Sequence, residues 1–213
     1  MNSLFINIPK WIQFFFKNYT WSIDTDQKEI YLTFDDGPTP EITEWVLGQL
    51  EKYEAKATFF CIGQNIEAHP DIFQKVIKAG HSIGNHTYNH LKGWNVQSEV
   101  YLENIKKTET LLNIYSLPNS RRLFRPPYGK ITRSQTKKIK EENYDIIMWK
   151  VLSADYDKTI SKEKCTENVL KNTTKGAIIV FHDSLKAAKN MRHTLPKVLD
   201  YYSKKGYAFK AIV

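Results

Sequence analysis

The chain has 213 residues, of which 41% are hydrophobic and 13% aromatic, enough to bury one sizeable core in a single domain. A charged fraction of 25%, only 9 Gly and 8 Pro, and the lack of low-complexity segments exclude collagen-like, mucin-like and wholly disordered proteins. The net charge of +8 could indicate an anionic partner, but the basic residues are scattered along the sequence, so we expect no nucleic-acid partner.

Residues 1–24 form a candidate N-terminal arm ahead of the first predicted strand. Pro9, Lys10 and Lys17 interrupt its apolar residues, so it falls short of the roughly 20 apolar residues of a membrane span. It also lacks the basic region and cleavage site of a signal peptide, which predicts a cytoplasmic or membrane-peripheral protein. From Pro9 onward, one helical face carries four apolar side chains, those of Trp11, Ile12, Phe15 and Phe16. This amphipathic face could dock on the domain or lie on a membrane surface, and we favour docking.

Along the rest of the chain, residues 25–213, segments with the period of a strand alternate with segments with the period of a helix. The predicted strands are 29–34, 57–62, 81–85, 122–125, 145–151, 177–182 and 207–212. The predicted helices are 40–53, 70–79, 97–113, 132–142, 161–173 and 190–205. This alternation predicts an α/β domain with about seven parallel strands, and both a doubly wound open sheet and a closed barrel fit the pattern.

Two adjacent carboxylates, Asp35 and Asp36, end the first predicted strand in the segment TFDDGP. Neighbouring side chains in a strand point to opposite faces, but the turn made by Gly37 and Pro38 can bring both carboxylates toward one site. The segment could equally be an acidic turn in which Asp36 caps the following helix.

Histidines are concentrated after the third predicted strand, where His86 and His90 stand four residues apart in HTYNH. The two side chains lie on one face if this segment is helical. A histidine pair with a carboxylate is the ligand set of a catalytic zinc, which keeps one coordination position open for water. A solvated loop with chance histidines is the alternative.

Polar residues also end the fourth and sixth predicted strands. In FRPPYG, a rigid loop aims Arg125 and presents the backbone amides of Tyr128 and Gly129, because the prolines have no N–H. In VFHD, His182 ends an apolar strand, a position where a lone histidine is more often structural. All four groups of polar residues nevertheless lie at the same end of their strands, which is where a (β/α) barrel builds its site.

The four motifs TFDDGP, HTYNH, FRPPYG and VFHD occur in this order over residues 29–213, and the chain therefore resembles the polysaccharide deacetylase family, carbohydrate esterases with a NodB homology domain. The resemblance implies that residues 25–213 form a distorted (β/α) barrel, in agreement with the predicted strand count. It implies metal-dependent hydrolysis of N-acetyl groups on amino-sugar glycans of the peptidoglycan or chitin type, with release of acetate. It further implies one divalent metal, with zinc expected and cobalt or nickel as substitutes. We expect the protein to be a monomer.

The resemblance also assigns roles to single residues. It implies that the metal is bound by Asp36, His86 and His90. Asp35 would be the catalytic base, steadied by Arg125, and His182 would be the acid. The Tyr128 amide would stabilise the oxyanion that forms from the acetyl carbonyl.

One segment departs from the family pattern. The family usually has Asp-x-x-Asp-aromatic after the fifth strand, whereas Leu152 occupies the first of these positions here. We therefore expect Asp155, the remaining carboxylate, to pair with Arg125. Pro127 and Trp149 are expected at the substrate, with Trp149 as a wall of the acetyl pocket.

Two other functions stay open at this point. A related metal-dependent hydrolase of small cyclic amides or O-acetyl esters would share the metal centre but would not need an open saccharide groove. A carbohydrate-binding protein that has lost catalysis is the second alternative, and the leucine at position 152 motivates it.

Overall fold

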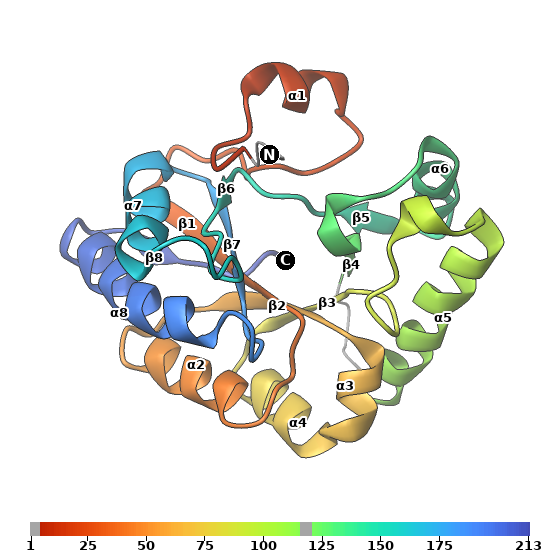
Figure 1. Cartoon of the computed structure of the whole chain (residues 1–213), viewed down its shortest axis with the longest axis horizontal. Coiled ribbons are helices and arrows are strands. Elements are labelled where there is room, and N and C mark those ends of the chain that lie inside the picture. The colour runs from red at the N-terminus through yellow and green to blue at the C-terminus, as the bar shows by residue number, and fades with distance from the viewer. Residues whose placement is uncertain (1–4, 116–120) are drawn as a thin grey trace.

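The computed structural model describes residues 5–115 and 121–213, which are built around one parallel sheet. Its strands are β1 (Glu29–Asp35), β2 (Ala57–Cys61), β3 (Ser82–Asn85), β4 (Arg122–Phe124), β5 (Tyr144–Ile146), β6 (Val151–Leu152), β7 (Ile178–His182) and β8 (Ala208–Phe209). The spatial order is β5-β4-β3-β2-β1-β7-β6, and β8 pairs with β1 beside this path. These seven strands curl into a half-barrel with helices around it (Figure 1), which confirms the predicted distorted (β/α) barrel.

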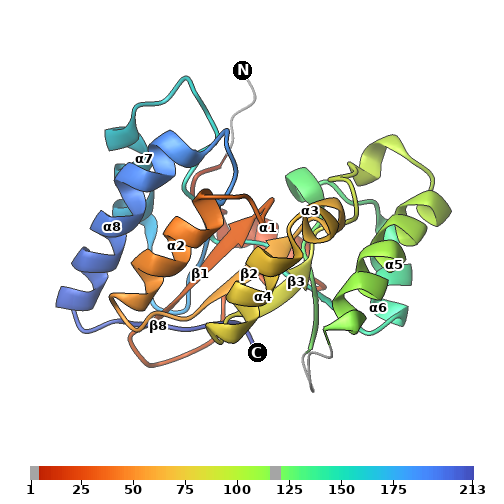
Figure 2. The same ribbon diagram turned by 90° about the horizontal axis from the view of Figure 1, so that it is seen from below.

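Helices form the outer layer of the molecule. They are α1 (Lys10–Phe15), α2 (Ile42–Glu51), α3 (Gly63–Ala68), α4 (Pro70–Lys78), α5 (Ser98–Ile114), α6 (Arg133–Glu141), α7 (Lys162–Asn172) and α8 (Ala188–Lys204). Figure 2 shows α2, α7 and α8 grouped toward one end of the curled sheet and α5 and α6 toward the other end. Across residues 5–115 and 121–213, none of the helices has the length and apolar character that crossing a bilayer requires.

The structure differs from the prediction in two elements. The predicted strand 145–151 is two strands, because β5 pairs with β4 at one edge of the sheet and β6 pairs with β7 at the other. The chain crosses between the two edges over residues 147–150, and this run contains no Gly or Pro that would reveal the break in the sequence. The short helix α3 was not predicted, since its six residues, GQNIEA, have no extended helical period.

The N-terminal arm lies across the seam between β5 and β6 (Figure 1). On the β6 side, the Ile8 amide donates to the Lys150 carbonyl at 3.0 Å, and the Leu152 amide donates to the Ile6 carbonyl at 2.8 Å. On the β5 side, the Thr20 amide donates to the Ile146 carbonyl at 2.9 Å. The arm therefore adds backbone hydrogen bonds to both edge strands.

The aromatic face of α1 does not dock on the domain as expected. The Trp11 and Phe15 side chains are 59% and 74% exposed, and α1 has no buried residue. The physical reason is that the segments on either side of α1 hold the arm through their backbones, which leaves the helix itself outside the core. The boundary at residue 24 between arm and domain stays a prediction.

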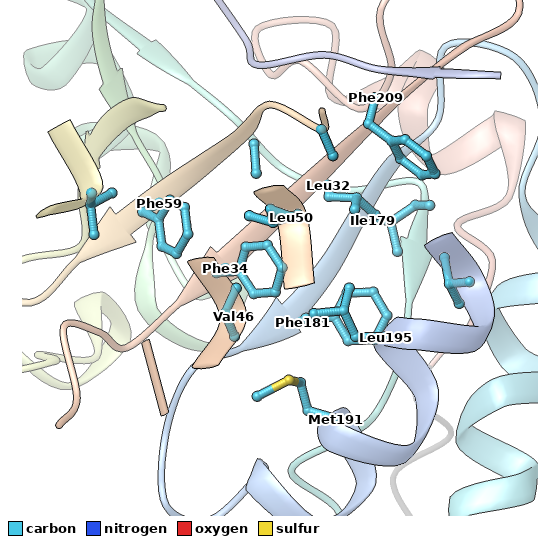
Figure 3. Packing of buried hydrophobic residues seen from close by; sticks show 14 of the residues in the cluster. Leu32, Phe34, Val46, Leu50, Phe59, Ile179, Phe181, Met191, Leu195 and Phe209 are labelled. Carbon is cyan, nitrogen blue, oxygen red and sulfur yellow. The ribbon is translucent and has the colours of Figure 1, made fainter. Parts of the chain in front are cut away.

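The main hydrophobic core lies between the sheet and helices α2 and α8 (Figure 3). At its centre, the Phe34 ring stacks on the rings of Phe59 and Phe181, with centroids 5.0 and 6.0 Å away. These three side chains come from β1, β2 and β7, and burial of each removes a large apolar surface from water. The packing thus fixes β1, β2 and β7 relative to one another close to their carboxyl ends.

Candidate active site

The polar residues at the strand ends converge because the strands are parallel and in register. Asp35, the last residue of β1, is the register partner of His182, the last residue of β7. The His86 amide donates to the Cys61 carbonyl at the end of β2, and the Arg125 amide donates to the Asn85 carbonyl at the end of β3, both at 3.0 Å. The side chains that follow β1, β3, β4 and β7 consequently meet at one edge of the half-barrel.

Asp36, His86 and His90 form a compact group whose ligand atoms lie within 4.8 Å of one another. The Asp36 Oδ1 atom lies 3.3 Å from His90 Nε2 and 3.8 Å from His86 Nε2. This oxygen is buried and has no hydrogen-bond partner among the described residues. A buried carboxylate oxygen facing two imidazole nitrogens is unusual without a cation, so these three residues fit a divalent metal.

The two histidines meet through a loop, and the helix considered for residues 86–90 does not form. Thr87 and His90 have positive φ angles of 65° and 59°, which turn the backbone sharply between the two imidazoles. The Asn85 side-chain oxygen accepts from the Thr87 amide at 2.9 Å, and the Thr87 hydroxyl accepts from the Leu91 amide at 3.0 Å. The side chains of Thr87 and of the preceding Asn85 therefore hold the turn.

Electrostatics favours the protonation states that bind metal. Burial lowers the pKa of His86 to about 4 and lowers that of His90 as well, so both imidazoles are neutral near pH 7. Burial alone would raise the pKa of Asp36, but charge interactions with nearby histidines, that with His182 being the largest, outweigh burial and lower this pKa, so the carboxyl stays ionised. The His86 Nδ1 atom lies 2.7 Å from the Arg125 carbonyl, a contact that makes Nδ1 the donor and leaves Nε2 free for a ligand.

Arg125 is completely buried and binds Asp35 directly. Its Nη1 atom lies 2.7 Å from Asp35 Oδ1 and 2.6 Å from the Thr33 hydroxyl. Its Nε and Nη2 atoms donate to the carbonyls of Ile147 and Met148 at 3.1 and 2.9 Å. One oxygen of Asp35 is thus held in place, and Oδ2 remains to accept a proton.

The expected pairing of Asp155 with Arg125 is wrong, because Asp155 binds His182. Its Oδ1 atom lies 2.7 Å from His182 Nδ1, and its Oδ2 atom accepts from the His182 backbone amide at 2.8 Å. Burial disfavours the charged imidazole, but the adjacent Asp155 carboxylate outweighs burial and raises the pKa of His182 to about 9. His182 is therefore protonated at neutral pH and is oriented by a completely buried acid.

Leu152 occupies an apolar environment in place of the family carboxylate. It is buried with Ala154 and Val180, and Ile6 of the arm and Trp149 pack against this cluster. At the guanidinium of Arg125, Asp35 is the bound carboxylate, and the other acceptors are the Thr33 hydroxyl and two backbone carbonyls.

The loop after β4 presents Tyr128 at the edge of the site. Tyr128 has φ 59° and a side chain 60% exposed, and its ring lies 4.5 Å from that of His90. Of the two backbone amides expected as donors to the substrate, the Gly129 amide already donates to the Pro126 carbonyl. The Tyr128 amide is the one that remains. Trp149 packs against Gly129, where an added Cβ would lie 2.8 Å from the indole ring.

Two residues that support the site were not assigned a role from the sequence. Asp183 is completely buried, and its carboxylate accepts from the Gly37 amide at 3.0 Å and from the Thr43 hydroxyl at 2.5 Å. Asn65 of α3 donates to the Asp36 carbonyl at 2.7 Å. Both hold the turn that carries Asp36, and the only signal for Asp183 was its place beside His182 in VFHD.

Comparisons with known proteins agree with this geometry. Residues 22–147 match the family model of polysaccharide deacetylases. Two peptidoglycan-N-acetylglucosamine deacetylases of Bacillus cereus are 39% identical over 78% of this chain and 34% identical over 91% of it. The chain spans 60% of the length of the first relative and 90% of the second. A solved peptidoglycan N-acetylglucosamine deacetylase superposes with a TM-score of 0.86 at 35% identity, covering 96% of this chain and 95% of that one.

Gly37→Ala should destabilise the protein, because the new Cβ would lie 2.0 Å from Asp183 Oδ2. Such overpacking typically costs about 1–3 kcal/mol of the free energy of unfolding. Gly48→Ala in α2 is the control: an added Cβ there meets no atom within 4 Å, and alanine favours the helix by up to about 1 kcal/mol. Urea unfolding of both variants measures the difference, and equal stabilities would contradict the proposed tight contact.

Proposed function

Because this chain belongs to the polysaccharide deacetylase family, we propose that it hydrolyses N-acetyl groups of amino-sugar glycans of the peptidoglycan type and releases acetate. The observation that carries the proposal is the placement of Asp35 directly beside the Asp36–His86–His90 group. The names of the Bacillus cereus relatives support N-acetylglucosamine as the sugar that is deacetylated.

Asp36, His86 and His90 would hold one divalent metal, and zinc is our proposal, with cobalt or nickel as substitutes. When bound at such a site, a divalent ion polarises the acetyl carbonyl and makes an attacking water more acidic. Three protein ligands are the usual number for a catalytic zinc, since water and substrate need the remaining positions.

Asp35 would act as the general base toward the attacking water. Arg125 holds Oδ1 of this carboxylate, so a proton from water would be accepted at Oδ2. A base in a fixed orientation needs no reorganisation during the reaction, and general base catalysis typically contributes about 10²–10⁴-fold to the rate. We assign Arg125 the role of positioning this base.

The Tyr128 amide would donate to the oxyanion that forms when water attacks the acetyl carbon. Pro127 has no N–H, and the Gly129 amide is already bonded to Pro126, so the loop has one suitable amide at this point. Losing one such donor typically costs about 3 kcal/mol of transition-state stabilisation.

His182 would donate a proton to the leaving amine, which is a poor leaving group without one. Its pKa of about 9 keeps it protonated at neutral pH, and Asp155 at Nδ1 leaves Nε2 as the donor. The T-shaped contact of the Tyr156 ring, 4.9 Å from the imidazole, also restricts its rotation.

Aromatic side chains support a glycan as the substrate. Tyr128 and Trp94 are 60% and 57% exposed, and Trp94 is fastened to the Tyr128 loop because its indole N–H donates to the Ile131 carbonyl at 3.0 Å. Exposed aromatic faces give apolar sugar faces a surface to pack on. We assign Trp149 to the acetyl pocket, since its buried indole N–H has no partner among the described residues.

Leu152 does not favour the alternative of lost catalysis. Arg125, Asp35 and His182 all have hydrogen-bonded partners in its presence. The remaining alternative is a hydrolase of small amides or O-acetyl esters. Such an enzyme would prefer those substrates to N-acetylglucosamine oligomers.

Acetate release from N-acetylglucosamine oligomers tests the proposed function. We expect chelation to abolish the activity and added zinc, cobalt or nickel to restore it. Asp35→Asn should keep the metal but lose about 10²-fold or more of the rate, because an amide cannot accept the proton. Asp200→Asn, an exposed acid of α8, is the control and should retain the rate. Full activity in Asp35→Asn, or hydrolysis of small amides and acetate esters only, would contradict the proposal.

Metal content tests the assigned ligands. Elemental analysis of the protein with His86→Ala and His90→Ala together should show loss of the bound metal, because only one ligand of the group remains. Asn89→Ala removes a polar side chain of the same loop and should leave the metal content unchanged. An undiminished content in the double variant would place the metal elsewhere.

The pH dependence tests the role of His182. The rate requires the protonated imidazole, so activity should fall as the pH rises through about 9. Asp155→Asn removes the carboxylate that raises this pKa, so the fall should move to lower pH. Rate profiles of both proteins measure the shift. A basic limb at the same pH in Asp155→Asn would show that another group produces it.

A further inference from the structure

Exposed aromatic side chains are concentrated on the N-terminal arm. Trp11, Phe14, Phe15 and Phe16 are 59%, 63%, 74% and 42% exposed. All four belong to α1 or the residue that ends it, and Phe5 of the same arm is 45% exposed. A group of this kind on a folded protein usually marks an interaction surface, since scattered single exposures are the norm.

The arm holds these side chains in a defined arrangement. The Gln13 side chain donates to the Ile8 carbonyl at 2.9 Å, and the Trp21 indole donates to the Phe16 carbonyl at 3.1 Å. The rings of Phe16 and Tyr19 stack with centroids 5.8 Å apart. These contacts order the arm internally, and backbone bonds to Lys150 and Ile146 hold it to the domain on either side of α1, so the exposed aromatic residues belong to an ordered surface.

Basic residues surround the aromatic group. Lys10 begins α1, Lys17 follows it by two residues, and both are exposed. A hollow of about 830 Å³ lies between the arm and α6, and Phe15 and Phe16 line it opposite three basic side chains, those of Arg133, Lys137 and Lys140. Glu141 also lines the hollow, 3.9 Å from Lys137. The surface therefore combines an apolar centre with an excess of positive charge at its rim.

We propose that the surface formed by α1 and the facing side of α6, the arm surface, binds an anionic lipid bilayer at the level of the headgroups. Trp and Phe side chains insert at this depth, and each Lys or Arg near an anionic membrane strengthens binding about fivefold. The arm surface lies on the side of the half-barrel between β6 and β5 (Figure 1), and the proposed metal group lies at the strand ends. Bilayer binding therefore uses none of the residues assigned to catalysis.

Charge argues against a second copy of the chain as the occupant. In a two-fold symmetric dimer, the same patch faces itself, so the basic rim residues of both copies would meet. Like charges brought together in this way oppose association, and the whole chain already carries a net charge of +8. An anionic bilayer can bury the aromatic side chains and attract the basic ones.

Vesicle flotation with the full chain tests this proposal. We expect binding to phosphatidylcholine vesicles that contain phosphatidylglycerol, weaker binding at high salt, and little binding to phosphatidylcholine alone. Trp11→Ser with Phe15→Ser should weaken binding at least about tenfold, since two aromatic side chains that would insert into the bilayer are lost. The control, Ile114→Ser with Leu185→Ser, removes side chains that are 68% and 82% exposed elsewhere and should bind like the original chain.

A second variant and its control test the contribution of the basic residues. Arg133→Gln with Lys137→Gln should weaken binding about fivefold for each charge removed. Lys52→Gln with Lys78→Gln removes two exposed charges outside the arm surface and should leave binding unchanged. No flotation of the unaltered chain, or equal binding by the arm variant and its control, would overturn the proposal. Sedimentation equilibrium tests whether a second copy of the chain binds the arm surface instead. A dimer that dissociates in Trp11→Ser with Phe15→Ser, with no effect on flotation, would identify the arm surface as a dimer interface and overturn the proposal as well.

Discussion

The guanidinium of Arg125 connects three parts of the molecule on which the site depends. It donates to Thr33 and Asp35 of β1 and to the carbonyls of Ile147 and Met148, where the chain crosses from β5 to β6. Its own backbone carbonyl lies 2.7 Å from the His86 ring. The base, one candidate metal ligand and the seam of the half-barrel are thus all placed relative to one buried residue.

Such a residue is tolerated only because nearly all of its donors are used. Removing a guanidinium from water costs several kcal/mol, and burial accordingly lowers the pKa of Arg125 while Asp35 opposes this effect. Two carbonyls, a hydroxyl and a carboxylate accept its hydrogen bonds, and the Phe60 ring lies 4.1 Å from its central carbon. Loss of this side chain would leave the Asp35 carboxylate buried without its partner, so Arg125 contributes to stability as well as to the orientation of the base.

The sequence predicted well the features that depend on local pattern and strand order. Alternating apolar segments located most strands, and because parallel strands end at one edge, Asp36, His86 and His90 could be expected close together. Sequence spacing could not decide which partner Asp155 takes. Both Arg125 and His182 follow strands that end at the same edge of the sheet, and in the structure Asp155 binds the His182 imidazole as well as the His182 backbone amide. The role of Asp183 could not be predicted either, because its partners Gly37 and Thr43 are about 140 residues away in the sequence.

The arm is more closely connected to the site than its position in the sequence suggests. β5 and β6 have three and two residues, and short edge strands of this kind expose backbone groups that need partners. The arm supplies them, and one of its bonds, from the Met148 amide to the Thr20 carbonyl at 2.8 Å, holds the same peptide segment whose carbonyl accepts from Arg125. Thr20 is therefore linked to Asp35 through Met148 and Arg125 alone. Leu152 provides no carboxylate, so the guanidinium is held by Thr33 and Asp35 on one side and by the carbonyls of Ile147 and Met148 on the other. The arm that closes the seam holds the segment carrying these two carbonyls.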